Sequence, residues 1–180
     1  MLGVLEGNTL GQMRTGAASA VATKYLARSE SRVMTIFGSG WQAESQLEGV
    51  SRVLPRLEHV NVLGRSHERS RRFASMMAER LDLEVTASAN PEQAVALADV
   101  ITTITGAREP LFDGHWLRPG VHINAAGSNF ADKHGSRCHQ SLSGGTPLET
   151  PGEPPPRSAS LVAYGWRQHC RGLFQTPIPA

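Results

Sequence analysis

A turn of mostly small residues, Gly38-Ser39-Gly40-Trp41-Gln42-Ala43, has the clearest chemical meaning in this sequence. It follows an apolar run from Val33 to Phe37 and precedes a helical pattern. A strand, a G-x-G-x-x-A turn and a helix together hold the pyrophosphate of a dinucleotide at the helix N-terminus. Similar turns also occur in ordinary strand–helix units. The candidate cofactor-binding residues here are Gly38, Ser39, Gly40, Trp41 and Gln42.

The residues after the next apolar run bear on the choice of cofactor. NAD-specific folds usually place Asp or Glu there, to bond the ribose 2′-hydroxyl. This chain has Gly64-Arg65-Ser66 and then Arg69. Arg65 and Arg69 would attract a 2′-phosphate and Ser66 could donate a hydrogen bond to it, which favours NADP(H) over NAD(H). The alternative is that Ser66 caps a helix and the arginines are solvated, and Ser66 can do both.

Other candidate functional residues lie before and after this region. Arg14 could clamp a carboxylate bidentately, or it could be a solvated arginine. Thr105 ends a predicted strand at the edge where open α/β sheets bind ligands, which makes it a candidate cofactor contact, although it could simply close the strand. His115 and His122 could be acid–base groups, but a structural or solvated role is favoured. The spacing of the cysteines and histidines near the C-terminus fits no compact metal site.

Apolar periodicity predicts the elements that position these residues. Strands are expected at 33–37, 59–63, 83–86, 99–104 and 121–125, separated by helices at about 43–54, 67–81 and 94–98. A helix rich in small residues is expected at 10–26. The Asn90-Pro91-Glu92-Gln93 sequence is typical of a helix start. This alternation predicts an α/β fold: a Rossmann-type doubly wound sheet of five parallel strands, preceded by a linking helix.

Composition limits the function classes. The 180 residues carry 18 basic and 16 acidic side chains, a formal charge of +2, which is too mild to indicate nucleic-acid or anionic-membrane binding. No apolar run approaches the roughly 18 residues of a membrane span, and the N-terminus shows no secretory pattern. The two cysteines favour a reduced, cytoplasmic setting.

The chain divides into three parts in this interpretation. Residues 1–30 are expected to be the end of a preceding domain and a linking helix, and residues 31–133 a dinucleotide-binding domain. Residues 134–180 are rich in Pro, Gly and Ser, and such a composition buries too little apolar surface to offset chain entropy. We expect this tail to be disordered.

Three segments occur in a specific order: Arg14-Thr15-Gly16-Ala17-Ala18, the glycine turn, and Asn124-Ala125-Ala126-Gly127-Ser128-Asn129 with Asp132-Lys133. Together they resemble the ornithine cyclodeaminase/μ-crystallin family over roughly residues 2–133. Members handle small amino and imino acids with a bound nicotinamide cofactor. The resemblance implies that Arg14 grips the substrate carboxylate and Thr15 approaches the cofactor. It also implies that Asn124, Ala125, Ala126, Gly127 and Lys133 complete the cofactor site.

Asn129 decides between activities within this resemblance. Ornithine cyclodeaminases carry a catalytic Asp at this position, and an amide cannot act as a carboxylate base. The sequence therefore favours NADPH-dependent reduction of a cyclic imino acid such as Δ1-pyrroline-2-carboxylate, with Arg14 and Asn129 as candidate catalytic residues. The alternatives are ornithine cyclodeamination, a dinucleotide-binding module without catalysis, and a non-catalytic protein that binds a small ligand. Family members have most of a substrate and dimer domain upstream, so a homodimer is expected only of full-length relatives.

Overall fold

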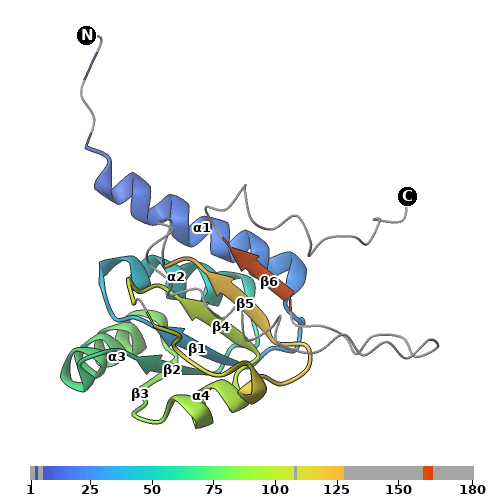
Figure 1. Ribbon diagram of the computed structural model, residues 1–180. Coiled ribbons are helices and arrows are strands. Elements are labelled where there is room, and N and C mark those ends of the chain that lie inside the picture. The colour runs from blue at the N-terminus through green and yellow to red at the C-terminus, as the bar shows by residue number, and fades with distance from the viewer. Residues whose placement is uncertain (1–2, 4–5, 108, 128–159, 164–180) are drawn as a thin grey trace, which may run out of the picture.

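A computed structural model describes residues 3, 6–107, 109–127 and 160–163 of the chain (Figure 1). Its centre is a parallel sheet with the strand order β3-β2-β1-β4-β5-β6. The strands are β1 (Val33–Phe37), β2 (His59–Leu63), β3 (Glu84–Ala87), β4 (Val100–Thr103), β5 (His122–Ala125) and β6 (Ser160–Ala163). The chain winds outward from β1 in one direction and then from β4 in the other. The predicted Rossmann-type, doubly wound arrangement is therefore confirmed.

Helices cover both faces of the sheet, and alternate strand residues supply two apolar cores. Helices α2 (Trp41–Val53) and α3 (His67–Leu81) pack on the face to which Met34 and Ile36 contribute. Helix α4 (Pro91–Leu97) and the short 3₁₀ helix η1 (Gly114–Trp116) pack on the opposite face, with Phe37 and Ile101. This burial on both faces explains why the strands read as continuous apolar runs rather than as alternating patterns.

Local signals fix where the helices begin. The Ser66 hydroxyl accepts a hydrogen bond from the Arg69 N–H at 3.4 Å, and the Asn90 side chain accepts one from the Gln93 N–H at 3.2 Å. Pro91 is the first residue of α4, where its missing N–H costs no hydrogen bond. Helix α3 ends at Leu81, and the C-cap residue Asp82 has a φ of 52° in the left-handed region. The predicted helix starts at Ser66 and Asn90 are confirmed.

Helix α1 (Asn8–Leu26) packs against α2 and reaches β5 and β6 (Figure 1). Small residues make this contact possible: a Cβ at Gly16 would lie 2.3 Å from the Ser45 carbonyl oxygen, and one at Gly49 would lie 2.8 Å from the Gly16 carbonyl oxygen. The two backbones therefore touch at this crossing. The buried hydroxyl of Thr23 also accepts a hydrogen bond from Asn124 Nδ2 at 2.9 Å, which ties α1 to β5.

The sheet has one strand more than the sequence analysis predicts. Strand β6 pairs in parallel with β5, from His122↔Ser160 to Ala125↔Ala163. It lies within the 134–180 segment that was expected to be disordered, so that expectation is wrong for these residues. The physical reason is that β5 offers an edge of backbone hydrogen-bonding groups for pairing, and Leu161 and Val162 are residue types that favour strands. The rest of the segment lies outside the described residues.

No helix in the described part of the chain is long and apolar enough to cross a membrane.

Candidate dinucleotide site

A cleft of about 1260 Å³ lies at the carboxyl ends of the strands. Its walls come from the segments that leave four neighbouring strands: 38–40 after β1, 64–67 after β2, 88–89 after β3 and 104–107 after β4. Strands β1 and β4 are neighbours at the point where the winding direction reverses. Open α/β sheets bind their ligands at such a switch point. The predicted turn and the predicted basic segment therefore line one cavity.

Gly38 is required by the packing of the protein itself. Its φ is 126°, a conformation that residues with a side chain rarely adopt, and a Cβ would lie 2.4 Å from the Ile104 carbonyl oxygen. The Gly38 N–H donates to the Leu63 carbonyl oxygen at 2.7 Å, and the Ile104 N–H donates to the Phe37 carbonyl oxygen at 2.8 Å. These bonds hold the exits of β1, β2 and β4 together as the floor of the cleft.

Gly40 is different, because the protein's own packing does not require it. Its φ of −94° and ψ of 177° suit any residue, and a Cβ there would meet no protein atom within 4 Å. Gly40 is also the N-cap of α2, and no side chain caps that helix. The N-terminus of α2 thus faces open space beside the cleft, with the favourable electrostatics that a helix N-terminus offers an anion.

The wall of the cleft that follows β2 is basic. Arg65, His67 and Arg69 all line it, next to Ser66. Within the described part of the chain, neither Arg65 nor Arg69 has a carboxylate at ion-pair distance, whereas most other arginines there do. Glu109 is the acidic residue found among the described lining residues. This wall therefore suits a ligand with negative charge.

Asp99 lies at the opposite, amino end of the sheet, just before β4. Its carboxylate accepts hydrogen bonds from the N–H groups of Arg32 at 2.8 Å and Val33 at 3.1 Å. It also pairs with the guanidinium groups of Arg28 at 2.7 Å and Arg118 at 3.1 Å. Burial by itself raises the pKa of Asp99, but these donors and cations together outweigh it and hold the pKa below the ordinary value. Asp99 does not line the cleft, so its role is to join α1, β1 and β4.

A family model for the ornithine cyclodeaminase/mu-crystallin family matches residues 1–137. The chain belongs to this family. Ketimine reductase mu-crystallin of Rattus norvegicus is 39% identical over 132 residues, which are 73% of this chain and 41% of the relative. Δ1-pyrroline-2-carboxylate reductase of Bacillus cereus is 41% identical over 127 residues, 71% of this chain and 38% of the relative. The chain thus spans about two fifths of the length of these relatives.

A solved structure supports the fold assignment. Δ1-pyrroline-2-carboxylate reductase of Thermococcus litoralis, in complex with NADH and L-proline, superposes with a TM-score of 0.65 at 40% identity. The match covers 68% of this chain and 38% of that one. The resemblance stated from the sequence motifs is confirmed by these comparisons.

The structure brings about half of the predicted site residues together. Those that line the cleft share a position at the carboxyl edge: Gly38, Ser39, Gly40, Arg65, Ser66, Arg69 and Thr105. Gly127 lies directly behind this wall, because a Cβ there would be 2.4 Å from the Thr105 carbonyl oxygen. Ala126 is adjacent, and its N–H donates to the Thr103 carbonyl oxygen at 2.9 Å.

The remaining predicted residues do not line this cleft. Asn124 is fully buried, and its side chain bonds Thr23 and lies 3.1 Å from His122 Nε2, so it holds α1 rather than facing the cavity. Ala125 is also buried. Trp41 and Gln42 form the first turn of α2 near α1, where the Gln12 side chain donates to the Trp41 carbonyl oxygen.

Arg14 and Thr15 lie on α1, outside the cleft lining. Arg14 is exposed, and the Thr15 hydroxyl donates to the Gly11 carbonyl oxygen at 2.7 Å within the helix. Asn129 and Lys133 lie outside the described residues. Of the two histidines considered, His122 is buried beside Asn124, and His115 is exposed with Nδ1 2.7 Å from Asp113. These placements agree with the favoured structural or solvated roles of the histidines.

Some cleft residues were missed by the sequence analysis. Ser88 and Ala89 follow β3, Glu109 and Leu111 lie in the loop after β4, and His67 begins α3. The rule that placed Thr105 at the carboxyl edge applies equally to the exit of β3, so Ser88 and Ala89 could have been found. The loop residues carry no comparable signal in the sequence.

Proposed function

We propose that this chain provides the dinucleotide-binding domain of an NAD(P)H-dependent reductase that acts on a small cyclic imino acid. The observation that carries the proposal is the cleft at the switch point, with Gly40 open toward it. Packing explains Gly38 but leaves Gly40 unexplained, whereas a pyrophosphate lying against the backbone would explain it. The relatives named as imine reductases support the reaction class.

We infer further that NADP(H) is preferred over NAD(H). Arg65, Ser66 and Arg69 line the part of the cleft where the ribose of the adenosine half would lie, and Gly64, the first residue after β2, is not a carboxylate that could bond a free 2′-hydroxyl. Two guanidinium groups without a carboxylate partner in the described chain favour a 2′-phosphate. The solved relative holds NADH, so the support for this preference comes from these three residues.

The nicotinamide, when bound, would supply a hydride to the carbon of the C=N bond. The contribution of this chain is to bind and orient. The α2 N-terminus and the Gly40 backbone would fix the phosphates, and Arg14 is the candidate for the substrate carboxylate. Asn129 can orient a substrate but cannot act as a carboxylate base, which favours imine reduction over ornithine cyclodeamination.

A second candidate is a dinucleotide-binding module without catalysis. It is favoured by one observation: Arg14, the candidate for the substrate carboxylate, is exposed on α1 and does not line the cleft. In this case the cleft would bind the cofactor, and the imino acid would not be turned over.

Two measurements separate the candidates. Calorimetric titration with NADP+ and NAD+ tests the cleft, and loss of NADPH absorbance in the presence of Δ1-pyrroline-2-carboxylate tests the reaction. Binding with turnover supports the reductase, and binding without turnover leaves the module. If neither dinucleotide binds to folded protein, both candidates are wrong. Arg65→Gln with Arg69→Gln should weaken NADP+ at least tenfold and leave NAD+ nearly unchanged.

A further inference from the structure

Helix α1 exposes an apolar surface that the proposed function does not use. Five of the eight large hydrophobic side chains that are exposed in the described part of the chain lie on this one helix. They are Leu10, Met13, Val21, Tyr25 and Leu26. Scattered apolar side chains are normal on a protein surface, but a group of them on one element marks a site of interaction.

Four of these residues, together with the exposed Ala17, form a continuous band along the outer side of the helix. This band, the α1 stripe, consists of Leu10, Met13, Ala17, Val21 and Tyr25. Successive members are three or four residues apart, which places them on one side of a helix. Each of the four large side chains is between 57% and 75% exposed.

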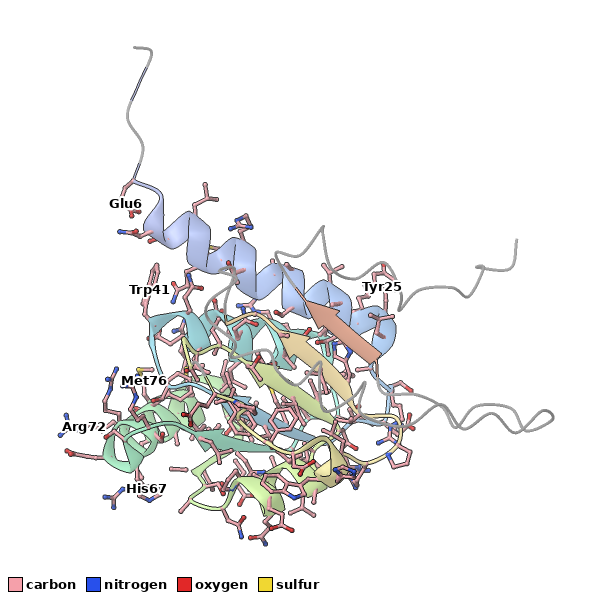
Figure 2. The ribbon with its side chains drawn as sticks, in the orientation of Figure 1. Glu6, Tyr25, Trp41, His67, Arg72 and Met76 are labelled. Carbon is pink, nitrogen blue, oxygen red and sulfur yellow. The ribbon has the colours of Figure 1, made fainter. Side chains whose placement is uncertain are left out.

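The inner side of α1 is buried, so the helix is apolar on both sides. It lies along the outside of the molecule, with α2 and the sheet against its inner side (Figure 1). Figure 2 shows Tyr25 at the C-terminal end of α1, and Trp41, another exposed apolar residue, near the N-terminal half of the helix. A helix that is apolar all round is typical of a helix that is covered all round.

The charges on α1 indicate which kind of partner fits the stripe. Arg14 and Lys24 are the charged side chains of this helix, and it carries no Asp or Glu. Within the described residues, neither cation has a carboxylate at ion-pair distance. Lys24 Nζ lies 5.7 Å from the centre of the Tyr25 ring, so this cation is directly beside the stripe. A partner with carboxylates next to its apolar residues therefore complements this surface.

Two other occupants fit less well. If two copies of α1 packed in parallel, Arg14 would face Arg14 and Lys24 would face Lys24, and antiparallel packing would bring Arg14 toward Lys24. Like charges at such spacing are unfavourable, and α1 has no carboxylate to offset them. An anionic membrane is disfavoured because segments that bind it usually carry clusters of about four to eight basic residues, whereas α1 carries two.

We propose that the outer side of α1 is a docking surface for an acidic amphipathic helix of a partner protein, which packs on the α1 stripe and places Asp or Glu beside Lys24. Side chains spaced three and four residues apart form ridges that fit between those of a second helix. The inference is independent of the dinucleotide site, because the stripe does not line the cleft. Arg14 remains available to the substrate in this arrangement.

The test uses two synthetic amphipathic peptides of about three heptads each. Both have Leu along one side; one has Glu next to the Leu residues, and the other has Lys at the same positions. Fluorescence anisotropy of the labelled peptides measures their binding to wild type, to Val21→Gln with Tyr25→Gln, and to Lys24→Glu. The matched control is Met76→Gln, which removes an exposed apolar side chain from α3. All these side chains are exposed, so Tm should stay unchanged, and titration with NADP+ reports on the cleft separately.

Wild type and Met76→Gln should bind the Glu peptide at least about tenfold more tightly than the Lys peptide. Replacing Val21 and Tyr25 should weaken the Glu peptide at least about tenfold, because two apolar contacts are lost. Lys24→Glu should reverse the preference, so that the Lys peptide binds more tightly.

Three results would overturn the docking surface and leave the proposed function standing. One is folded protein that binds neither peptide, or binds both equally. Another is a dimer in analytical ultracentrifugation that Val21→Gln with Tyr25→Gln dissociates, because the occupant would then be a second copy of the chain. The third is binding to phosphatidylglycerol vesicles without binding to the Glu peptide, because the surface would then face a membrane.

Discussion

Alanine at Gly38 and alanine at Gly40 should have opposite consequences, although the two residues are two positions apart. At Gly38 an alanine must adopt a φ of 126° and place its Cβ 2.4 Å from the Ile104 carbonyl oxygen. The unfavourable backbone conformation costs about 1–2 kcal/mol, and displacing the Ile104 backbone adds about 1–3 kcal/mol. We expect Gly38→Ala to lower the free energy of unfolding by about 3 kcal/mol.

At Gly40 the two stability effects of an alanine nearly cancel. Glycine is the better N-cap residue by about 0.5–1 kcal/mol, whereas alanine restricts the unfolded chain and gains about 0.4–1 kcal/mol. No protein atom lies within 4 Å of the added Cβ. The unfolding free energy should therefore change by less than about 0.5 kcal/mol. The methyl group would, however, occupy the space through which a pyrophosphate approaches the backbone, so affinity should fall at least tenfold.

Thermal unfolding and calorimetric titration with NADP+ measure the two effects separately. For a chain of this length, 1 kcal/mol corresponds to about 2–4 °C in Tm. Gly38→Ala should thus lower Tm by about 6–12 °C, and Gly40→Ala by no more than about 2 °C. A folded Gly40→Ala protein that binds NADP+ as tightly as the wild type would refute the reasoning, because the phosphates would then lie elsewhere.

Three further predictions concern stability. Gly16→Ala should lower the free energy of unfolding by about 2–4 kcal/mol, because its Cβ would lie 2.3 Å from the Ser45 carbonyl oxygen. Gly11→Ala, in open space on the same helix, should raise it by up to about 1 kcal/mol. Urea unfolding compares the two variants, and equal effects would contradict the close contact between α1 and α2. Asp99→Asn should cost about 1–2 kcal/mol at pH 7. Because the pKa of Asp99 is lowered in the folded state, its contribution to stability is present above about pH 4 and is lost as the pH falls through the folded pKa. The unfolding free energies of wild type and variant should therefore converge in acid. A difference that stays constant with pH would contradict this. A double-mutant cycle of Thr23→Val and Asn124→Leu should give a coupling of about 1 kcal/mol in the free energy of unfolding. Additive effects of the two substitutions would contradict a stabilising hydrogen bond between these side chains.

Local signals in the sequence predict much of the fold. The strand at Val33–Phe37 and the strand at His59–Leu63 have the predicted bounds, because both are apolar runs closed by glycine turns. The helix starts at Ser66 and Asn90 also follow from short-range capping chemistry. Strand β6 could not be predicted in this way, because its stability comes from pairing with β5, about 38 residues away in the sequence.

The site was harder to predict, because side-chain direction depends on tertiary packing. Asn124 lies near the end of β5, and the family resemblance implied that it contacts the cofactor. Its neighbour in space is Thr23, about 101 residues earlier in the chain, and the pairing turns the amide toward α1. The periodicity of a strand covered on both faces does not distinguish these two directions. By contrast, Gly38 and Arg65 both line the cleft, because strand exits fix the path of the backbone itself.

The distribution of charge between the two edges of the sheet connects these observations. At the amino edge, the Asp99 carboxylate accepts from two backbone N–H groups and pairs with two guanidinium groups, so these arginines have a partner within the protein. At the carboxyl edge, Arg65 and Arg69 both line the cleft, and neither has a carboxylate partner in the described chain. A polyanionic ligand would supply the negative charge that the described residues around these two arginines lack, which agrees with the proposed cofactor site.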